Sequence, residues 1–145
     1  MVSAAEPGMG RFSVEVELAN DADLVRAQAG IIKPEQVRRE RILGVVDSGA
    51  TRLVIPTAVA ERLGFDITSN MRAPYADGRT AERPVAERIR LTYGDRGSVF
   101  NAIVEPNRDS ALIGAIVLED LDLIIDCGKQ TLLPRDPDNI VSEIE

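Results

Sequence analysis

Short apolar stretches separated by turn residues dominate this chain, and they limit it to a small set of β architectures. Residues 12–18 alternate strictly between apolar and polar side chains, which is typical of a strand with one buried face. Comparable apolar stretches follow at 37–47, 53–55, 87–93, 98–104, 123–125 and 131–133. The spacing of strand–helix–strand units is missing. About seven or eight short strands therefore predict a mostly β chain, folded as a small closed or nearly closed barrel.

Two brief helices and a hairpin are predicted between these strands. Thr57–Leu63 follows a proline and precedes Gly64, which is the usual punctuation of a short helix. Ala115–Asp120 suits a second one. Residues 67–86 predict a hairpin that turns at Asp77-Gly78, because both of these residue types tolerate positive φ in a two-residue turn.

The composition excludes several classes of site. The chain has 145 residues, no histidine and one cysteine, Cys127. It cannot build a Ser-His-Asp or Cys-His nucleophile, nor a zinc or iron–sulfur site made from His and Cys. Acid–base chemistry then rests mainly on carboxylates, and we expect no cofactor. The net charge of −7 argues against nucleic acid as a partner, because phosphate binding needs a basic patch.

The size of the chain indicates one domain. We predict a flexible leader at residues 1–10, the folded domain at 11–134 and an acidic C-terminal tail at 135–145. The leader lacks the basic start and apolar run of a signal peptide, and the apolar runs elsewhere are too short to cross a bilayer. A lone cysteine cannot form an intramolecular disulfide, so the fold does not depend on an oxidising compartment. These features predict a cytoplasmic protein that does not associate with membranes.

The segment Val45–Pro56 contains the residues best suited to chemistry. Asp47 ends an apolar strand, stands in a turn with Ser48 and Gly49, and is followed by a second apolar strand. A carboxylate at this place is costly to desolvate unless hydrogen-bond donors surround it, and the neighbouring backbone amides can donate. An isolated Asp-Ser-Gly is more commonly an ordinary turn between two strands. The tripeptide alone is therefore a weak signal.

A second element makes the pattern specific. Sixty-six residues after Asp47 comes Ile113, in the sequence Ala-Leu-Ile-Gly, which again precedes a short helix and an apolar strand. With Val-Val-Asp-Ser-Gly-Ala, the following strand and the Asp77-Gly78 hairpin, this order resembles the retropepsin-like (clan AA) aspartic proteases, the family of retroviral proteases and their prokaryotic relatives. The resemblance covers about residues 12–134 and implies an acid-protease barrel with a flap hairpin. Residues 20–35 look like extra sequence relative to compact retroviral protomers.

The resemblance implies a role for each residue of the motif. Asp47 would be the catalytic aspartate, and Ser48 would lock two catalytic loops together across a dimer. Gly49 would present its carbonyl to the substrate backbone, and Ala50 would line the wall. Further substrate-binding positions are implied at Tyr75, Ala76, Asp77, Gly78, Arg79, Ile113 and Gly114. Arg72, Arg79 and Arg83 could favour acidic side chains in a substrate, although most surface arginines only solvate a face.

The single Asp-Ser-Gly-Ala predicts a homodimer. Aspartic proteases use two carboxyls that share one proton, and the second must here come from another copy. Such a dimer would hydrolyse peptides or proteins by attack of an activated water. Two alternatives remain. A dimer of the same fold could bind peptides or serve in assembly without cutting. Asp47-x-Gly49-x-Thr51 also matches the phosphate-binding loop of sugar kinases and actin-like ATPases, although those need a much longer, two-domain chain.

Overall fold

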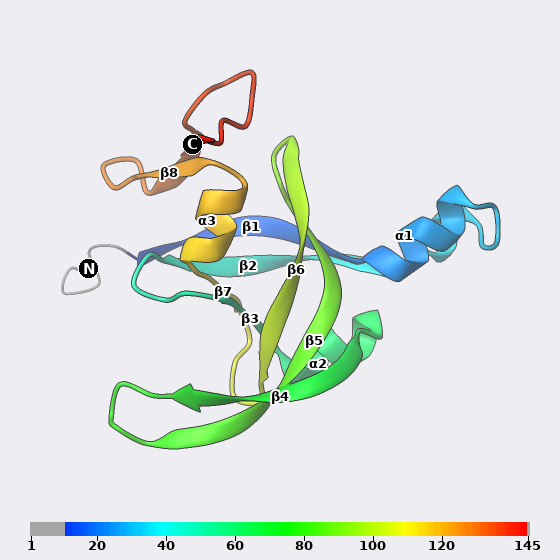
Figure 1. Ribbon diagram of the computed structural model, residues 1–145, viewed down its shortest axis with the longest axis horizontal. Coiled ribbons are helices and arrows are strands. Elements are labelled where there is room, and N and C mark those ends of the chain that lie inside the picture. The colour runs from blue at the N-terminus through cyan, green and yellow to red at the C-terminus, as the bar shows by residue number, and fades with distance from the viewer. Residues whose placement is uncertain (1–10, 145) are drawn as a thin grey trace.

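The computed structural model describes residues 11–144, so the predicted leader at 1–10 and the last residue lie outside the described residues (Figure 1). Within that range the strands are β1 Arg11–Asn20, β2 Arg39–Asp47, β3 Leu53–Pro56, β4 Asp66–Pro74, β5 Thr80–Tyr93, β6 Arg96–Glu105, β7 Ala111–Ile113, β8 Leu123–Asp126 and β9 Thr131–Pro134. The helices are α1 Asp21–Gln28, α2 Thr57–Leu63 and α3 Ala115–Asp120, with a turn of 3-10 helix at Pro34–Gln36. The predicted bounds of α2 and α3 are confirmed.

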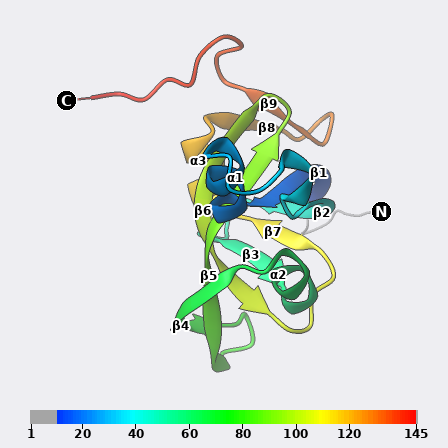
Figure 2. The same cartoon turned by 90° about the vertical axis from the view of Figure 1, so that its right-hand side faces the viewer.

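Six strands close into a barrel, as Figures 1 and 2 show from two sides. Their order is β1-β2-β7-β3-β6-β5, and β5 returns to pair with β1. The first half of β5 forms a hairpin with β4, while its second half closes the barrel. A register shift between Ala86 and Ile89, where Arg88 has φ 62°, separates the two halves. The predicted mostly β fold with a closed barrel is confirmed.

Alternating side chains fill the barrel. In β1, Phe12, Val14, Val16 and Leu18 are buried, as the alternation predicts, and the residues between them point outward. The least exposed large side chains of the core include Leu18, Leu53, Ile55, Ile89, Leu91, Ile113 and Leu121. Burying each of these contributes about 1.5–3 kcal/mol. α2 and α3 add Val59, Leu63, Val117 and Leu118 to the same core, so helices and barrel form one packed unit.

The β4–β5 hairpin differs from the prediction in its turn. Five residues, 75–79, separate the two strands, so the predicted two-residue turn at Asp77-Gly78 is wrong. The Gly78 amide donates to the Tyr75 carbonyl at 3.0 Å, and the Tyr75 amide donates to the Arg79 carbonyl at 2.8 Å. Only Gly78 has positive φ within this loop, at 89°. The wider loop arises because one left-handed residue closes a five-residue connection, whereas a two-residue turn of the expected kind needs two.

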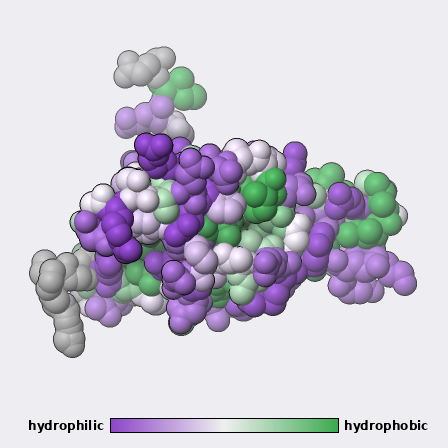
Figure 3. Space-filling model, turned by 90° about the horizontal axis from the view of Figure 1, so that it is seen from below, coloured by the Kyte–Doolittle hydropathy of each residue, from purple (hydrophilic) through white to green (hydrophobic). Residues whose placement is uncertain are grey.

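Residues 20–35, the extra sequence, form α1 and the turns that follow it. This segment projects from one end of the barrel, and apolar side chains are visible at that end in the space-filling view (Figure 3). Val25 and Ile31 are among the exposed large apolar residues there. The helix has eight residues, about two turns. No helix within residues 11–144 combines the length and the apolar character needed to cross a lipid bilayer.

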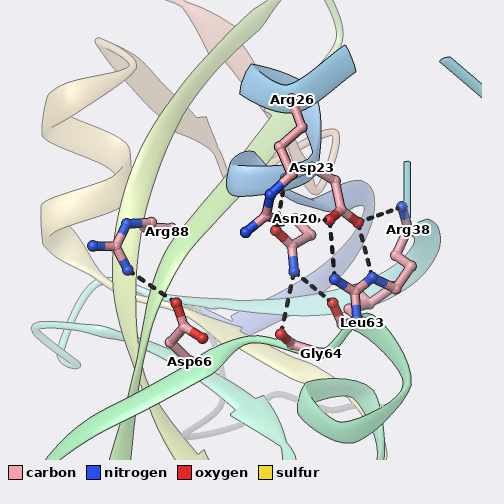
Figure 4. Close-up of polar contacts among 8 residues, drawn as sticks. All are labelled: Asn20, Asp23, Arg26, Arg38, Leu63, Gly64, Asp66 and Arg88. Atoms are coloured by element: carbon pink, nitrogen blue, oxygen red, sulfur yellow. Dashed lines mark hydrogen bonds and ion pairs between the residues drawn. The ribbon is translucent and has the colours of Figure 1, made fainter. Parts of the chain in front are cut away.

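Three residues, which we name the α1 anchor, tie this segment to the barrel: Asn20, Asp23 and Arg38 (Figure 4). Asp23 accepts hydrogen bonds from Arg38 Nε at 2.8 Å, Nη2 at 3.0 Å and the backbone amide at 3.0 Å. Asn20 caps α1 by accepting from the Asp23 amide, and it donates to the Leu63 carbonyl at 2.8 Å. The hydrogen bonds from Arg38 outweigh the effect of burial and lower the pKa of Asp23 to about 2.

The end of the described chain is also fastened to the barrel. Arg96 of β6 is buried, and its guanidinium donates to the carbonyls of Leu121, Asp122, Asp136 and Asn139. Arg135 donates to Asp122 Oδ1 at 2.7 Å, and Asp122 Oδ2 accepts from the Val141 amide at 3.0 Å. The hydrogen bonds from the Val141 amide and from Arg135 lower the pKa of Asp122. The segment after β9 therefore contacts β6 and the turn after α3.

Candidate active site

Asp47 lies at the end of β2, in a turn lined with amides. The side chain is 16% exposed. Its Oδ1 accepts from the Gly49 amide at 3.0 Å, and its backbone carbonyl accepts from the Ala50 amide at 3.0 Å. The donors that the sequence requires around a carboxylate at this position are thus present. Ser48 is exposed, and its hydroxyl makes no hydrogen bond with the residues that the structure describes.

Arg11 is a site residue that the sequence did not reveal. Its Nη2 lies 2.9 Å from Asp47 Oδ2, and its side chain is 63% exposed. The two residues are partners across the β1–β2 ladder. The alternation of residues 12–18 predicts the strand, but not the register that places its first residue opposite Asp47. No signal in the sequence pairs them. In the protomer, the Asp47 carboxylate therefore faces a positive charge.

The start of α3 holds the Asp47 turn in place through backbone hydrogen bonds. The Ala115 amide donates to the Ala50 carbonyl at 2.8 Å, and the Ile116 amide donates to the Thr51 carbonyl at 2.9 Å. Gly114 makes this approach possible, because a Cβ there would stand 2.7 Å from the Arg52 carbonyl oxygen. The two parts of the motif, far apart in the sequence, are thus held together by backbone contacts.

A cavity of about 800 Å³ opens between this turn and the β4–β5 hairpin; we name it the main cavity. Residues Gly49–Arg52 form one wall, the hairpin forms another, and Val54, Ile103 and Leu112 contribute apolar surface. Its volume is in the range of ordinary ligand pockets. A second cavity of about 510 Å³ lies between β6 and α3 and meets the turn only at Arg52 and Leu53. The main cavity is therefore the one associated with the motif.

The structure brings only part of the predicted substrate-binding set to the main cavity. Gly49, Ala50, Tyr75 and Arg79 line it, whereas Ala76, Asp77 and Gly78 at the tip of the hairpin do not. Ile113 is buried in the core, and Gly114 lies against the turn, so neither lines the cavity. Leu112 lines it instead, because alternate residues of a strand point to opposite sides and Ile113 points inward.

Three residues, the hairpin anchor, join the loop half of the hairpin to the barrel: Tyr75, Arg83 and Glu105. The Tyr75 hydroxyl donates to Glu105 Oε2 at 2.8 Å, and Arg83 Nε donates to Glu105 Oε1 at 2.8 Å. The Glu105 side chain is 13% exposed. The hydrogen bond that Arg83 donates to Glu105 raises the pKa of Arg83. All three residues line the main cavity.

The comparison with protein families settles the relationship of the chain. A family model described as aspartyl protease matches residues 36–117, more than half of the 145 residues. This span contains β2, the Asp47 turn, the hairpin and Gly114. The chain belongs to the retropepsin-like aspartyl proteases.

The predicted resemblance to clan AA is thereby confirmed. No curated protein matches the chain. The phosphate-binding alternative is not supported, because the described residues form one closed barrel in place of two nucleotide-clasping domains. Among residues 11–144, no group of three or more Asp, Glu, Cys or His residues is placed to hold a metal ion.

Proposed function

We propose that this aspartyl protease is an endopeptidase that acts as a homodimer, with Asp47 of each protomer forming the catalytic pair. The observation that carries the proposal is the position of Asp47. Its carboxyl stands at the end of β2, in a turn supported by α3, directly before the residues that line the main cavity. A peptide in that cavity would lie beside the carboxyl. The β4–β5 hairpin would act as a flap that excludes bulk water.

The chemistry follows from two carboxyls that cannot both ionise at close range. In aspartic proteases two such groups about 3 Å apart share one proton. The ionised carboxylate takes a proton from water, the water oxygen attacks the carbonyl carbon, and the protonated carboxyl donates to the carbonyl oxygen. The C–N bond then breaks as the leaving nitrogen receives a proton. No covalent enzyme intermediate and no histidine are needed, in agreement with the composition.

We propose a dimer because each chain has a single Asp-Ser-Gly-Ala turn and so supplies one carboxyl of the catalytic pair. Asp126-Cys127-Gly128 lies at the β8–β9 turn and Asp95 at the β5–β6 turn, and neither borders the main cavity. Ile124 and Leu133 form an exposed apolar pair across β8 and β9. In Figure 1 the β8–β9 turn, the Asp47 turn and the hairpin loop project toward the same side of the molecule. This side is our proposed dimer surface.

Cleavage of a diverse peptide library, read by mass spectrometry, tests the activity. Asp47→Asn should reduce turnover at least about 1,000-fold, because it removes both carboxyls of the proposed catalytic pair. The far-ultraviolet spectrum should stay that of the wild type. Asp95→Asn, which changes another turn aspartate, is the matched control and should cut normally. Undiminished turnover by Asp47→Asn would refute the assignment.

Light scattering tests the dimer. We expect a dimer at micromolar concentration, and a monomer that still cleaves peptides would contradict the proposal. Ser48→Ala should weaken the dimer more than it destabilises the protomer, because the exposed hydroxyl is free to bond to a second copy. The midpoint of dissociation on dilution measures this effect. Location in the cytoplasm and the lack of a nucleic-acid partner stay predictions from composition.

The Arg11–Asp47 ion pair favours a second candidate function. A carboxylate neutralised within its own protomer would suit a dimer that binds peptides or serves in assembly without cutting them. That candidate predicts peptide binding with no turnover by the wild type. It also predicts that Arg11→Met does not restore cleavage. The library experiment therefore separates the two functions.

A further inference from the structure

The main cavity has a charge opposite to that of the whole chain. Five arginines and one carboxylate, Glu105, line it, although the net charge of the protein is −7. The arginines come from three parts of the fold: Arg52 from the Asp47 turn, Arg72, Arg79 and Arg83 from the hairpin, and Arg108 from the loop before β7. Positive charge is thus concentrated beside the proposed catalytic group.

Three of these arginines have no acidic partner within residues 11–144. Arg83 is paired with Glu105 and Arg79 with Asp77. Arg108 donates only to neutral oxygens, those of Ser110 and the Ala111 carbonyl. For Arg52 and Arg72, neither an ion pair nor a side-chain hydrogen bond is formed with the described residues. Three guanidinium groups therefore border the main cavity with their charge uncompensated.

This pattern sets the cavity apart from the rest of the protein. The chain has fifteen arginines, and eleven of them form an ion pair with a carboxylate of the described residues. A twelfth, Arg96, is buried and bonds to four backbone carbonyls. The remaining three are those at the main cavity. A face of arginines that merely solvates the surface would not gather the unpaired members at one site.

We propose that the main cavity selects peptides with Asp or Glu side chains near the scissile bond, which rests on the function proposed above. A guanidinium binds a carboxylate through two parallel hydrogen bonds, so an acidic side chain is the natural partner of Arg52, Arg72 or Arg108. A two-fold dimer would repeat these arginines, so acidic residues are expected on both sides of the bond. The local positive charge also steers an acidic peptide toward a protein that would otherwise repel it.

Matched peptides test the preference. Peptides that the library shows to be cleaved are made in acidic form and with each Asp or Glu replaced by Asn or Gln. The acidic form should have a kcat/KM at least about tenfold higher, and the advantage should shrink as salt is raised. Equal kcat/KM for the two forms would overturn the preference and leave the protease function standing.

Variants locate the groups responsible. Arg52→Gln and Arg72→Gln remove guanidinium groups that form no side-chain bond with residues 11–144. The fold should therefore be unaffected, while the preference falls about fivefold or more for at least one of them. Arg88→Gln, which removes an exposed arginine paired with Asp66 away from the cavity, is the matched control and should keep the full preference. An unchanged preference in both cavity variants would overturn the assignment.

Binding without turnover separates this inference from the proposed function. Fluorescence anisotropy with Asp47→Asn measures affinity independently of chemistry. Its probes are an Asp- and Glu-containing library peptide, chosen whether or not it is cleaved, and the same peptide with Asn and Gln at those positions. If the wild type cleaves nothing but Asp47→Asn binds the acidic peptide about tenfold more tightly, the selectivity stands and the protease function fails. If the two peptides bind with equal affinity, or neither binds, the selectivity is overturned.

Discussion

The α1 anchor and the hairpin anchor are built from the same kinds of group, yet they suit opposite tasks. Each joins a projecting segment to the barrel through a carboxylate, an arginine and a neutral hydrogen-bonding side chain. In the α1 anchor, the Asp23 side chain is 5% exposed and accepts from the Arg38 backbone amide, while the Asn20 side chain accepts from the Asp23 backbone amide. In the hairpin anchor, Glu105 is 13% exposed and bonds only to side chains.

The backbone bonds make the difference. Opening the α1 anchor would leave the Asp23 charge buried and would free two backbone amides, that of Asp23 at the start of α1 and that of Arg38 just before β2. We therefore expect this anchor to open only when the local structure unfolds. Releasing Glu105 separates three side chains at the edge of a cavity and leaves the β4–β5 ladder intact. We therefore expect that the hairpin can shift without unfolding, as the proposed flap over a substrate requires. The predictions below test this contrast in decreasing order of effect.

The largest effect is expected from breaking the α1 anchor. Asp23→Asn should lower the free energy of unfolding by about 3 kcal/mol, because it leaves Arg38 without its acidic partner. Urea denaturation at pH 7 measures the change. Asp66→Asn is the matched control, since its carboxylate is 65% exposed and pairs with Arg88 in the same region (Figure 4). That control should change stability by less than about 0.5 kcal/mol. Equal losses of stability in Asp23→Asn and Asp66→Asn would contradict a special role for the α1 anchor.

Lowering the pH should weaken the same anchor. The pKa of Asp23 falls from 3.8 to about 2 on folding, so its contribution is complete above pH 4 and is lost as the pH drops toward 2. The lost part amounts to about 2 kcal/mol. The difference in unfolding free energy between wild type and Asp23→Asn should therefore shrink over this range. A difference that stays constant from pH 5 to pH 2 would contradict the role assigned to the charge.

Removing the cap should have an intermediate effect. Asn20→Ala takes away the acceptor for the Asp23 amide and the donor to the Leu63 carbonyl, both at buried positions. We expect a loss of about 1.5 kcal/mol in urea denaturation. Asn70→Ala, at an exposed position of β4, is the control and should lie within about 0.5 kcal/mol of the wild type. Comparable losses for both variants would argue against the cap.

The smallest effect on global stability is expected at the hairpin anchor. Glu105→Gln should lower the unfolding free energy by less than about 1 kcal/mol, because a neutral acceptor remains for Tyr75. Hydrogen exchange of the Tyr75 amide, which is bonded across the hairpin loop, should nevertheless become about fivefold faster. The amides of α1 should not change. A loss as large as that of Asp23→Asn would show that both anchors are structural.

Much of the candidate site could be predicted because its signals are local. Asp47-Ser48-Gly49-Ala50 between two apolar strands is one such signal, and Gly114 before α3 is another. Each is recognised from neighbouring residues, and their order along the chain identifies the family. Helix punctuation likewise gave the bounds of α2 and α3. The five-residue hairpin loop was missed, because Asp77-Gly78 fits more than one type of turn.

By itself, the sequence determined the class of the fold, the family and the carboxyl on which the proposed chemistry depends. Only the tertiary structure decided that Arg11 faces Asp47, that Leu112 and not Ile113 lines the cavity, and that Arg52, Arg72 and Arg108 border it together. The physical reason is the same in each case. Alternation and turn signals act over a few residues, whereas these contacts depend on strand register and barrel closure, which join segments tens of residues apart.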